Sequence, residues 1–312
     1  MEPGLLKSAD WPLVIDLYFF LGGIAGGAFV LATVAAFVDE RRFRDLMRVG
    51  YYVAFLAALP APILLIVDLG LPSRFLHMLV VSKPNTDIGM NAITVGPLHL
   101  KLLSPMSVGA WGLLIFGICA FLAALMVYLE DRGKRRFGIS RAIVGIVGSI
   151  FGFFLAAYPG VLLGATARPL FISSHWLGAL FLAVGAATGA AAIALLMSIL
   201  GRQNREALAR LMNFTAFALV VEAALLVLFA ISVWMSGSAG IRAALGQLLA
   251  GTDSVLFWLA VVIGLVIPLG MVLGGVLRNA NPGLAALISI LVLVGGFGVK
   301  YVLIAAGQRV LS

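Results

Sequence analysis

The sequence predicts an all-α, polytopic integral membrane protein with eight transmembrane helices. Of its 312 residues, 62% are hydrophobic and only 11% are charged, and the mean hydropathy is +1.14. The apolar residues gather into eight runs, each long enough to cross a hydrocarbon core of about 30 Å. The net charge of +8 comes from basic residues that lie between these runs. They therefore indicate membrane topology, and no nucleic-acid partner is expected.

The eight expected spans follow one another with mostly short connections. The second span ends where Gly70 and Pro72 interrupt the helix. The longest connection covers residues 71–107, and the next longest, 236–253, contains the amphipathic stretch IRAALGQLLAG, which suits a membrane interface. The expected spans are residues 11–38, 49–70, 109–129, 140–164, 174–200, 208–235, 254–278 and 282–307.

The distribution of basic residues predicts the orientation in the membrane. Of the 21 lysines and arginines, 13 follow the first, third, fifth and seventh spans, and 8 are spread over the other side. The positive-inside rule then places both termini outside. In a bacterial cytoplasmic (inner) membrane, this is the periplasmic side.

An internal repeat is suggested by two glycine-rich stretches. The first span contains YFFLGGIAGGAF and the fifth LFLAVGAATGAA, so that Gly23 and Gly27 align with Gly185 and Gly189 at one offset. This favours two four-helix bundles, residues 1–170 and 171–312. The alternative is that small residues recur independently wherever membrane helices pack closely.

Ionisable side chains gather in one outer layer of the first half. Asp68 lies near the outer end of the second span, within LIVDLGLPSRFLHML, and is followed by Arg74 and His77. Asp16 and Tyr158 lie near the outer ends of the first and fourth spans. Such a layer offers the hydrogen bonds and proton exchange that a quinone headgroup needs. The alternative is a helix-end cap with Asp68 paired to Arg74, together with an interfacial tyrosine.

Other cofactors and sites fit the sequence less well. Two of the three histidines lie in a loop and the third at a helix end, so we expect no haem. Cys119 is the only cysteine, so the protein has no cysteine-ligated iron–sulfur cluster of its own, and we expect no metal in it. In the second half, Glu222 and Lys300 lie within spans. They form either a structural ion pair or part of a proton path.

The sequence resembles the NrfD/PsrC-type membrane subunits of bacterial respiratory oxidoreductases such as polysulfide reductase. The resemblance rests on YFFLGGIAGGAF, DLGLPSRFLHML, LLSPMSVGAWGLLIFG and YPGVLLG. It implies a site for menaquinone or ubiquinone on the outer side of the first four helices. It also implies a ferredoxin-like iron–sulfur partner and, beyond it, a molybdopterin catalytic subunit.

By motif match, Asp68 and Tyr158 take the family's quinone-site carboxylate and tyrosine positions. Asp16 stands where some members carry asparagine and histidine, and it is a second candidate for proton exchange. Arg74 and His77 would tune Asp68 and shape the docking surface. The expected function is therefore electron exchange between a membrane quinone and an outside iron–sulfur subunit, by a protein that is not catalytic alone. The alternatives are a secondary transporter or ion-translocating protein, or a passive anchor.

Overall fold

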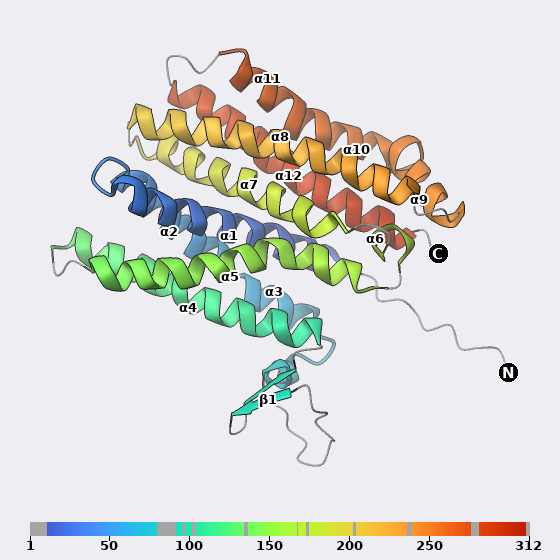
Figure 1. The fold of residues 1–312 in the computed structure, drawn as a ribbon, viewed down its shortest axis with the longest axis horizontal. Coiled ribbons are helices and arrows are strands. Elements are labelled where there is room, and N and C mark those ends of the chain that lie inside the picture. The colour runs from blue at the N-terminus through green and yellow to red at the C-terminus, as the bar shows by residue number, and fades with distance from the viewer. Residues whose placement is uncertain are drawn as a thin grey trace.

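The structure is a bundle of long helices that run side by side along its longest axis (Figure 1). It is a computed structural model that describes residues 11–79, 92–95, 98–101, 104–133, 137–166, 168–172, 175–201, 204–235, 239–275 and 281–309. Within these residues, eight helical segments are long and apolar enough to cross a membrane. The predicted all-α membrane fold is confirmed.

The helices follow the predicted spans closely. The second and seventh spans are composite: α2 continues into α3, and α10 continues through a π-helical turn, η2, into α11. The spanning elements are α1 (Leu13–Asp39), α2 (Arg44–Ala58), α3 (Ala61–Asp68), α4 (Pro105–Asp131), α5 (Gly138–Gly164), α7 (Leu177–Ile199), α8 (Arg205–Met235), α10 (Ser254–Val261), η2 (Val262–Val266), α11 (Ile267–Leu273) and α12 (Pro282–Arg309).

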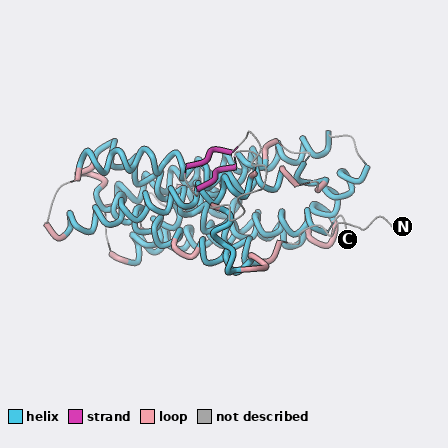
Figure 2. The backbone as a smooth tube through the Cα atoms, turned by 90° about the horizontal axis from the view of Figure 1, so that it is seen from below, coloured by secondary structure: helices cyan, strands magenta, loops and turns pink. Residues whose placement is uncertain are grey.

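Shorter elements occupy the connections. The 3₁₀ helix η1 (Pro72–Met78) follows α3, and the strands β1 (Ala92–Val95) and β2 (Leu98–Lys101) form an antiparallel hairpin before α4. This hairpin, magenta in Figure 2, was not predicted from the sequence. Two further helices are α6 (Pro169–Ile172) and α9 (Ala239–Ala250). The second of these contains the predicted amphipathic stretch.

Both ends of the described residues lie at the same end of the bundle, as an even number of spans requires (Figure 1). We call this the terminal end, and the end with the α1–α2 and α4–α5 turns the opposite end. At the terminal end, Trp11 and Gln308 exchange two hydrogen bonds, of 3.0 and 3.2 Å. Arg168 donates to the carbonyl of Gln308 over 2.6 Å. A cation suits that position because the C-terminus of α12 carries partial negative charge.

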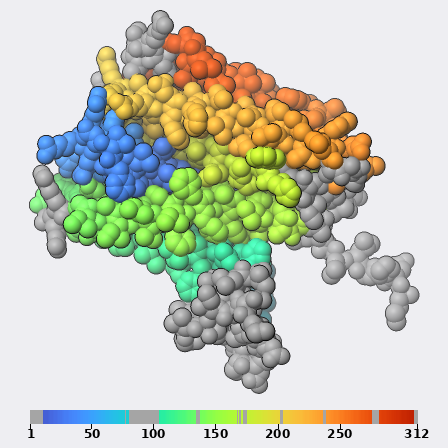
Figure 3. Space-filling model, in the orientation of Figure 1, coloured from blue at the N-terminus to red at the C-terminus, as the bar shows by residue number. Residues whose placement is uncertain are grey.

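The first and second halves of the protein meet along the length of the bundle (Figure 3). At their contact, the parallel helices α1 and α7 cross at glycines. The Cα of Gly185 lies 3.3 Å from where a Cβ at Gly23 would be, and a Cβ at Gly27 would overlap the carbonyl of Gly185. Gly23 and Gly185 are equivalent positions in the predicted repeat, and they touch each other. The division into two bundles at residue 170 stays a prediction.

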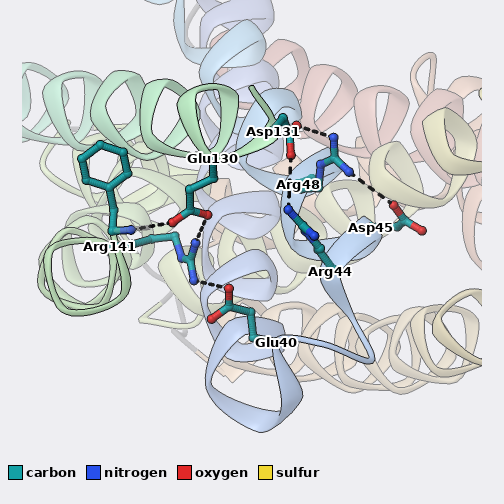
Figure 4. Close-up of polar contacts among 8 residues, drawn as sticks. Glu40, Arg44, Asp45, Arg48, Glu130, Asp131 and Arg141 are labelled. Atoms are coloured by element: carbon teal, nitrogen blue, oxygen red, sulfur yellow. Dashed lines mark hydrogen bonds and ion pairs between the residues drawn. The ribbon is translucent and has the colours of Figure 1, made fainter. Parts of the chain in front are cut away.

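Ion pairs join four helix ends at the opposite end (Figure 4). The Arg141 side chain, 4% exposed, places its guanidinium between the carboxylates of Glu130 and Glu40, with 2.6 Å to the latter. Arg48 pairs with Asp131 close by. Basic residues that indicated topology in the sequence therefore also hold α1, α2, α4 and α5 together.

Candidate functional site

A cavity of about 340 Å³ opens near the terminal end of the first half. Its walls come from α1, α3, η1, α4 and α5 and are mostly apolar, with a few polar side chains among them. Ligand sites commonly combine these properties. The lining residues are Trp11, Pro12, Ile15, Tyr18, Phe19, Leu65, Asp68, Leu69, Met78, Met106, Gly109, Ala110, Tyr158, Leu162 and Thr166.

Tyr158 lies on the α5 wall of the cavity and is 7% exposed. Its hydroxyl donates a hydrogen bond to the carbonyl of Pro105 at the start of α4, over 2.8 Å. The proton of the phenol is therefore in use, while its oxygen still has a lone pair that can accept. In this arrangement Tyr158 is an acceptor for a ligand hydroxyl. It becomes a donor to a ligand carbonyl only by releasing Pro105.

Asp68 is the last residue of α3 and is exposed at the cavity wall. A carboxylate at a helix C-terminus is unfavourable, because it lies next to the partial negative charge of the last carbonyls. Asp68 forms no hydrogen bond or ion pair with any described residue, so local helix stability does not explain it. Its carboxylate is available to a ligand or to a proton.

Asp16 lies at the same depth as the cavity but does not line it. Asp16 and Gly23 are seven residues apart, so they share one face of α1, which packs against Gly185 of α7. That face is about a third of a turn from the side formed by Ile15 and Tyr18. Asp16 is 3% exposed, and its Oδ1 has no hydrogen-bond partner among the described residues.

Arg74 and His77 lie on η1, beside the cavity. Arg74 is exposed and forms no ion pair with Asp68, so the alternative of a helix-end pair between these two is wrong in this structure. The side chain of His77 lies outside what the structure describes. The part of η1 that reaches the cavity wall is Met78.

A second, larger hollow of about 450 Å³ adjoins the first. The two share Leu65, Leu69, Met78 and Ala110. The second hollow lies between α3, η1 and α4, and its lining is entirely apolar; we call it the apolar groove. Its other lining residues are Pro62, Ile66, Phe75, Leu79, Leu113, Leu114, Gly117, Ile118 and Phe121. A molecule with a polar head and an apolar tail could occupy both hollows.

Several cavity residues were not found from the sequence. Trp11, Tyr18 and Thr166 resemble ordinary interfacial residues there, but in the structure they line the cavity. Gly109 is part of the motif LLSPMSVGAWGLLIFG, yet its role appears only in three dimensions. A Cβ at this position would overlap the ring of Tyr158. The one sequence signal for this packing role was the small size of residue 109, in a span that could pack against the helix carrying YPGVLLG.

Comparison with known proteins gives the family. The model of the family described as "Polysulphide reductase, NrfD" matches residues 2–312, which is nearly the whole sequence. The protein belongs to the NrfD family. As a member with eight apolar helices, it is a multi-pass membrane protein.

Relatives of this NrfD protein include components of reductases. It is 29% identical over 313 residues to a protein NrfD homolog of Haemophilus influenzae, covering 96% of this protein and 94% of that one. It is 25% identical over 311 residues to a polysulfide reductase component of Wolinella succinogenes, covering 96% and 93%. A shorter match, 29% over 82 residues, covers 26% of this protein and 19% of a selenate reductase component of Mesobacillus selenatarsenatis. These names support a membrane subunit of a respiratory reductase complex.

A solved structure shares the fold at low sequence identity. The bd oxidase structure from Geobacillus thermodenitrificans superposes with a TM-score of 0.62 at 14% identity. The match covers 96% of this protein and 86% of that one. At this identity, the likeness concerns the arrangement of helices alone.

Proposed function

We propose that this NrfD protein binds a quinone or quinol in the cavity and exchanges its electrons with an iron–sulfur subunit of a reductase complex. The observation that carries this proposal is the cavity itself. Asp68 and Tyr158 line one mostly apolar chamber, and that chamber shares four wall residues with the adjoining apolar groove. A carboxylate, a phenol and a long apolar slot match a redox-active ring with a polyprenyl tail.

Individual cavity residues suit particular parts of such a ligand. A quinone, when bound, supplies two-electron chemistry coupled to two protons. Asp68 would exchange a proton at its carboxylate, since nothing described in the protein occupies that group. Tyr158 would accept a hydrogen bond from the quinol hydroxyl without giving up Pro105. Phe19, Leu65 and Leu162 would exclude water from the ring.

The site would face the outer side of a bacterial cytoplasmic membrane. The cavity lies at the terminal end, and the opposite end carries the arginine-rich turns, which the positive-inside rule places in the cytoplasm. A C-terminal reporter that is active only in the cytoplasm should therefore be silent. If it is active there, this orientation is wrong.

An iron–sulfur subunit would dock on the connection between α3 and α4. This protein has a single cysteine and so cannot hold such a cluster by itself. The connection carries η1, which contributes Met78 to the cavity wall, and the hairpin of β1 and β2, which projects from the bundle near α3 and α4 (Figure 1). Cross-linkers placed at Lys83, outside the described residues, or at Lys101 should capture a cysteine-rich subunit from the outer side, itself associated with a molybdopterin subunit. Capture of a cytoplasmic protein alone would contradict this arrangement.

The binding part of the proposal is tested by titrating the purified complex with a quinone analogue whose fluorescence is quenched on binding. Saturable binding is expected, and the quinone extracted from the complex, menaquinone or ubiquinone, should compete for it. An intact complex that neither retains a quinone nor binds the analogue would count against the proposal.

A further inference from the structure

Lys300 of α12 is buried directly behind one wall of the cavity. It is 1% exposed, and its ammonium donates a hydrogen bond to the carbonyl of Phe19 over 3.1 Å. Phe19 itself lines the cavity. The ammonium therefore lies one residue behind the cavity wall and reaches it from the second half of the protein.

The surrounding residues make room for this cation. A Cβ on Gly23 would lie 2.6 Å from the Lys300 ammonium, so the ammonium occupies the space that a side chain at position 23 would take. On the α7 side, the ammonium lies 5.1 Å from the centre of the Phe181 ring, a cation–π contact. Gln308 and Lys300 of α12 bond Trp11, which precedes α1, and Phe19 of α1, and the two residues of each pair are eight positions apart. The contact is thus part of the regular packing of two antiparallel helices.

One buried carboxylate is the electrostatic counterpart of this lysine. Glu222 of α8 is 2% exposed and lies within electrostatic range of Lys300. The two do not approach closely enough for a direct ion pair, so the structural pair considered from the sequence is not formed between these described side chains. Asp16 on α1 forms no ion pair with a described residue either.

Stability does not account for such an arrangement. Ionisable groups inside a membrane bundle are costly, and a buried charge pair is commonly no more stable than apolar residues of the same volume. A cation behind an apolar ligand cavity does have an electrostatic consequence. Coulomb attraction falls slowly with distance where water is excluded, so its field reaches the cavity.

We propose that Lys300 is a positioning residue of the cavity, whose buried charge makes the site favour a ligand ring that carries negative charge. It touches no ligand and acts through the Phe19 segment of α1. This inference rests on the proposed quinone function and adds a residue from the second half to the site. During quinone chemistry, negative charge that reaches the ring before its protons would be stabilised by this cation.

A pair of probes of nearly equal size tests the proposal in the purified complex. One is a hydroxynaphthoquinone, which is ionised at neutral pH, and the other is its neutral methyl ether. Lys300→Met removes the charge but keeps the length of the side chain. The affinity for the anionic probe should fall about tenfold, while the affinity for the ether changes by less than about twofold.

Glu222→Gln should change the affinity for the anionic probe in the opposite direction. It leaves the cation without its counter-charge, so the anionic probe should bind about threefold more tightly, again with little change for the ether. If Lys300→Met does not assemble, Glu222→Gln and the double variant Lys300→Met/Glu222→Gln carry the test. The double variant removes both charges and should bind the anionic probe less tightly than Glu222→Gln.

The outcomes separate this inference from the function on which it rests. If the wild-type complex binds neither probe, the proposed quinone function fails. If it binds both, but the variants change the two affinities equally or not at all, Lys300 has only a structural role and the inference is overturned.

Discussion

Gly109 lies directly against the ring of Tyr158, so that a single methyl group at position 109 would overlap the phenol. This contact between α4 and α5 sets where the hydroxyl of Tyr158 meets the carbonyl of Pro105. It also sets the shape of the cavity wall. The glycine of one span and the tyrosine of another thus form a single structural unit.

Gly109→Ala should therefore displace Tyr158 from its place. Forcing a methyl group into a packed contact costs about 1–3 kcal/mol, and here the tyrosine ring must move. We expect the affinity for a quinone analogue to fall about tenfold while the complex still assembles. Gly270→Ala on α11 is the matched control, because a Cβ there meets nothing within 4 Å. Equal affinities in the two variants would contradict the role of this contact.

Tyr158→Phe should weaken analogue binding without much loss of stability. It removes the hydroxyl that bonds Pro105, worth about 1 kcal/mol, and with it the acceptor offered to the ligand. Tyr51→Phe is a control of the same chemistry, since the Tyr51 hydroxyl lies 3.1 Å from that of Thr33, away from the cavity. Both variants should lose similar thermal stability, and only Tyr158→Phe should lose affinity.

Asp68→Asn should separate proton transfer from packing. The side chain keeps its shape but cannot exchange a proton, so quinol-linked turnover should fall at least about tenfold. Assembly should be unchanged, because the carboxylate bonds no described residue. Asp45→Asn on α2, at the opposite end, is the control and should turn over as wild type does. Near-normal turnover of assembled Asp68→Asn would remove this residue from the proposed role.

Arg141→Met should destabilise the bundle without affecting the cavity. Removing this guanidinium leaves the largely buried Glu130 carboxylate with the Phe137 N–H as its remaining described partner. Losing one member of a buried ion pair typically costs about 3–5 kcal/mol. Arg42→Met breaks an exposed pair with Glu206 and should cost much less, because solvent screens exposed pairs. Thermal unfolding in detergent measures both effects. Quinone-analogue affinity, measured below the transition, should equal that of wild type.

The transmembrane spans were predictable because few backbone conformations are stable in lipid. Backbone groups in a membrane must be satisfied within the helix, so long apolar runs become helices. The end of α3 at Asp68 followed from Gly70 and Pro72, and both residues stand where expected. The break before α3 was not foreseen, although Pro60 and Pro62 remove two backbone donors there. The hairpin of β1 and β2 has no periodic signal strong enough to predict.

The depth of each candidate site residue in the membrane could be predicted from the sequence, but the direction of its side chain could not. Counting residues along a helix places Asp16, Asp68 and Tyr158 at similar heights, and the structure puts Asp68 and Tyr158 on one cavity. Asp16 does not line the cavity, because the direction of a side chain depends on how its helix is rotated. That rotation follows from glycine contacts such as Gly23 with Gly185, which only the packed bundle reveals. For the same reason, the sequence suggested Glu222 as the partner of Lys300, whereas the Lys300 ammonium bonds the carbonyl of Phe19 on α1.

The central claim, that a quinone ring occupies the cavity, is tested most directly by photoaffinity labelling. The intact complex is irradiated with an azidoquinone, and the labelled peptides are identified by mass spectrometry. We expect label, competed by unlabelled quinone, on peptides that contain Asp68, Met106 or Tyr158. Competed label confined to α8–α12, with none on the cavity peptides, would contradict it.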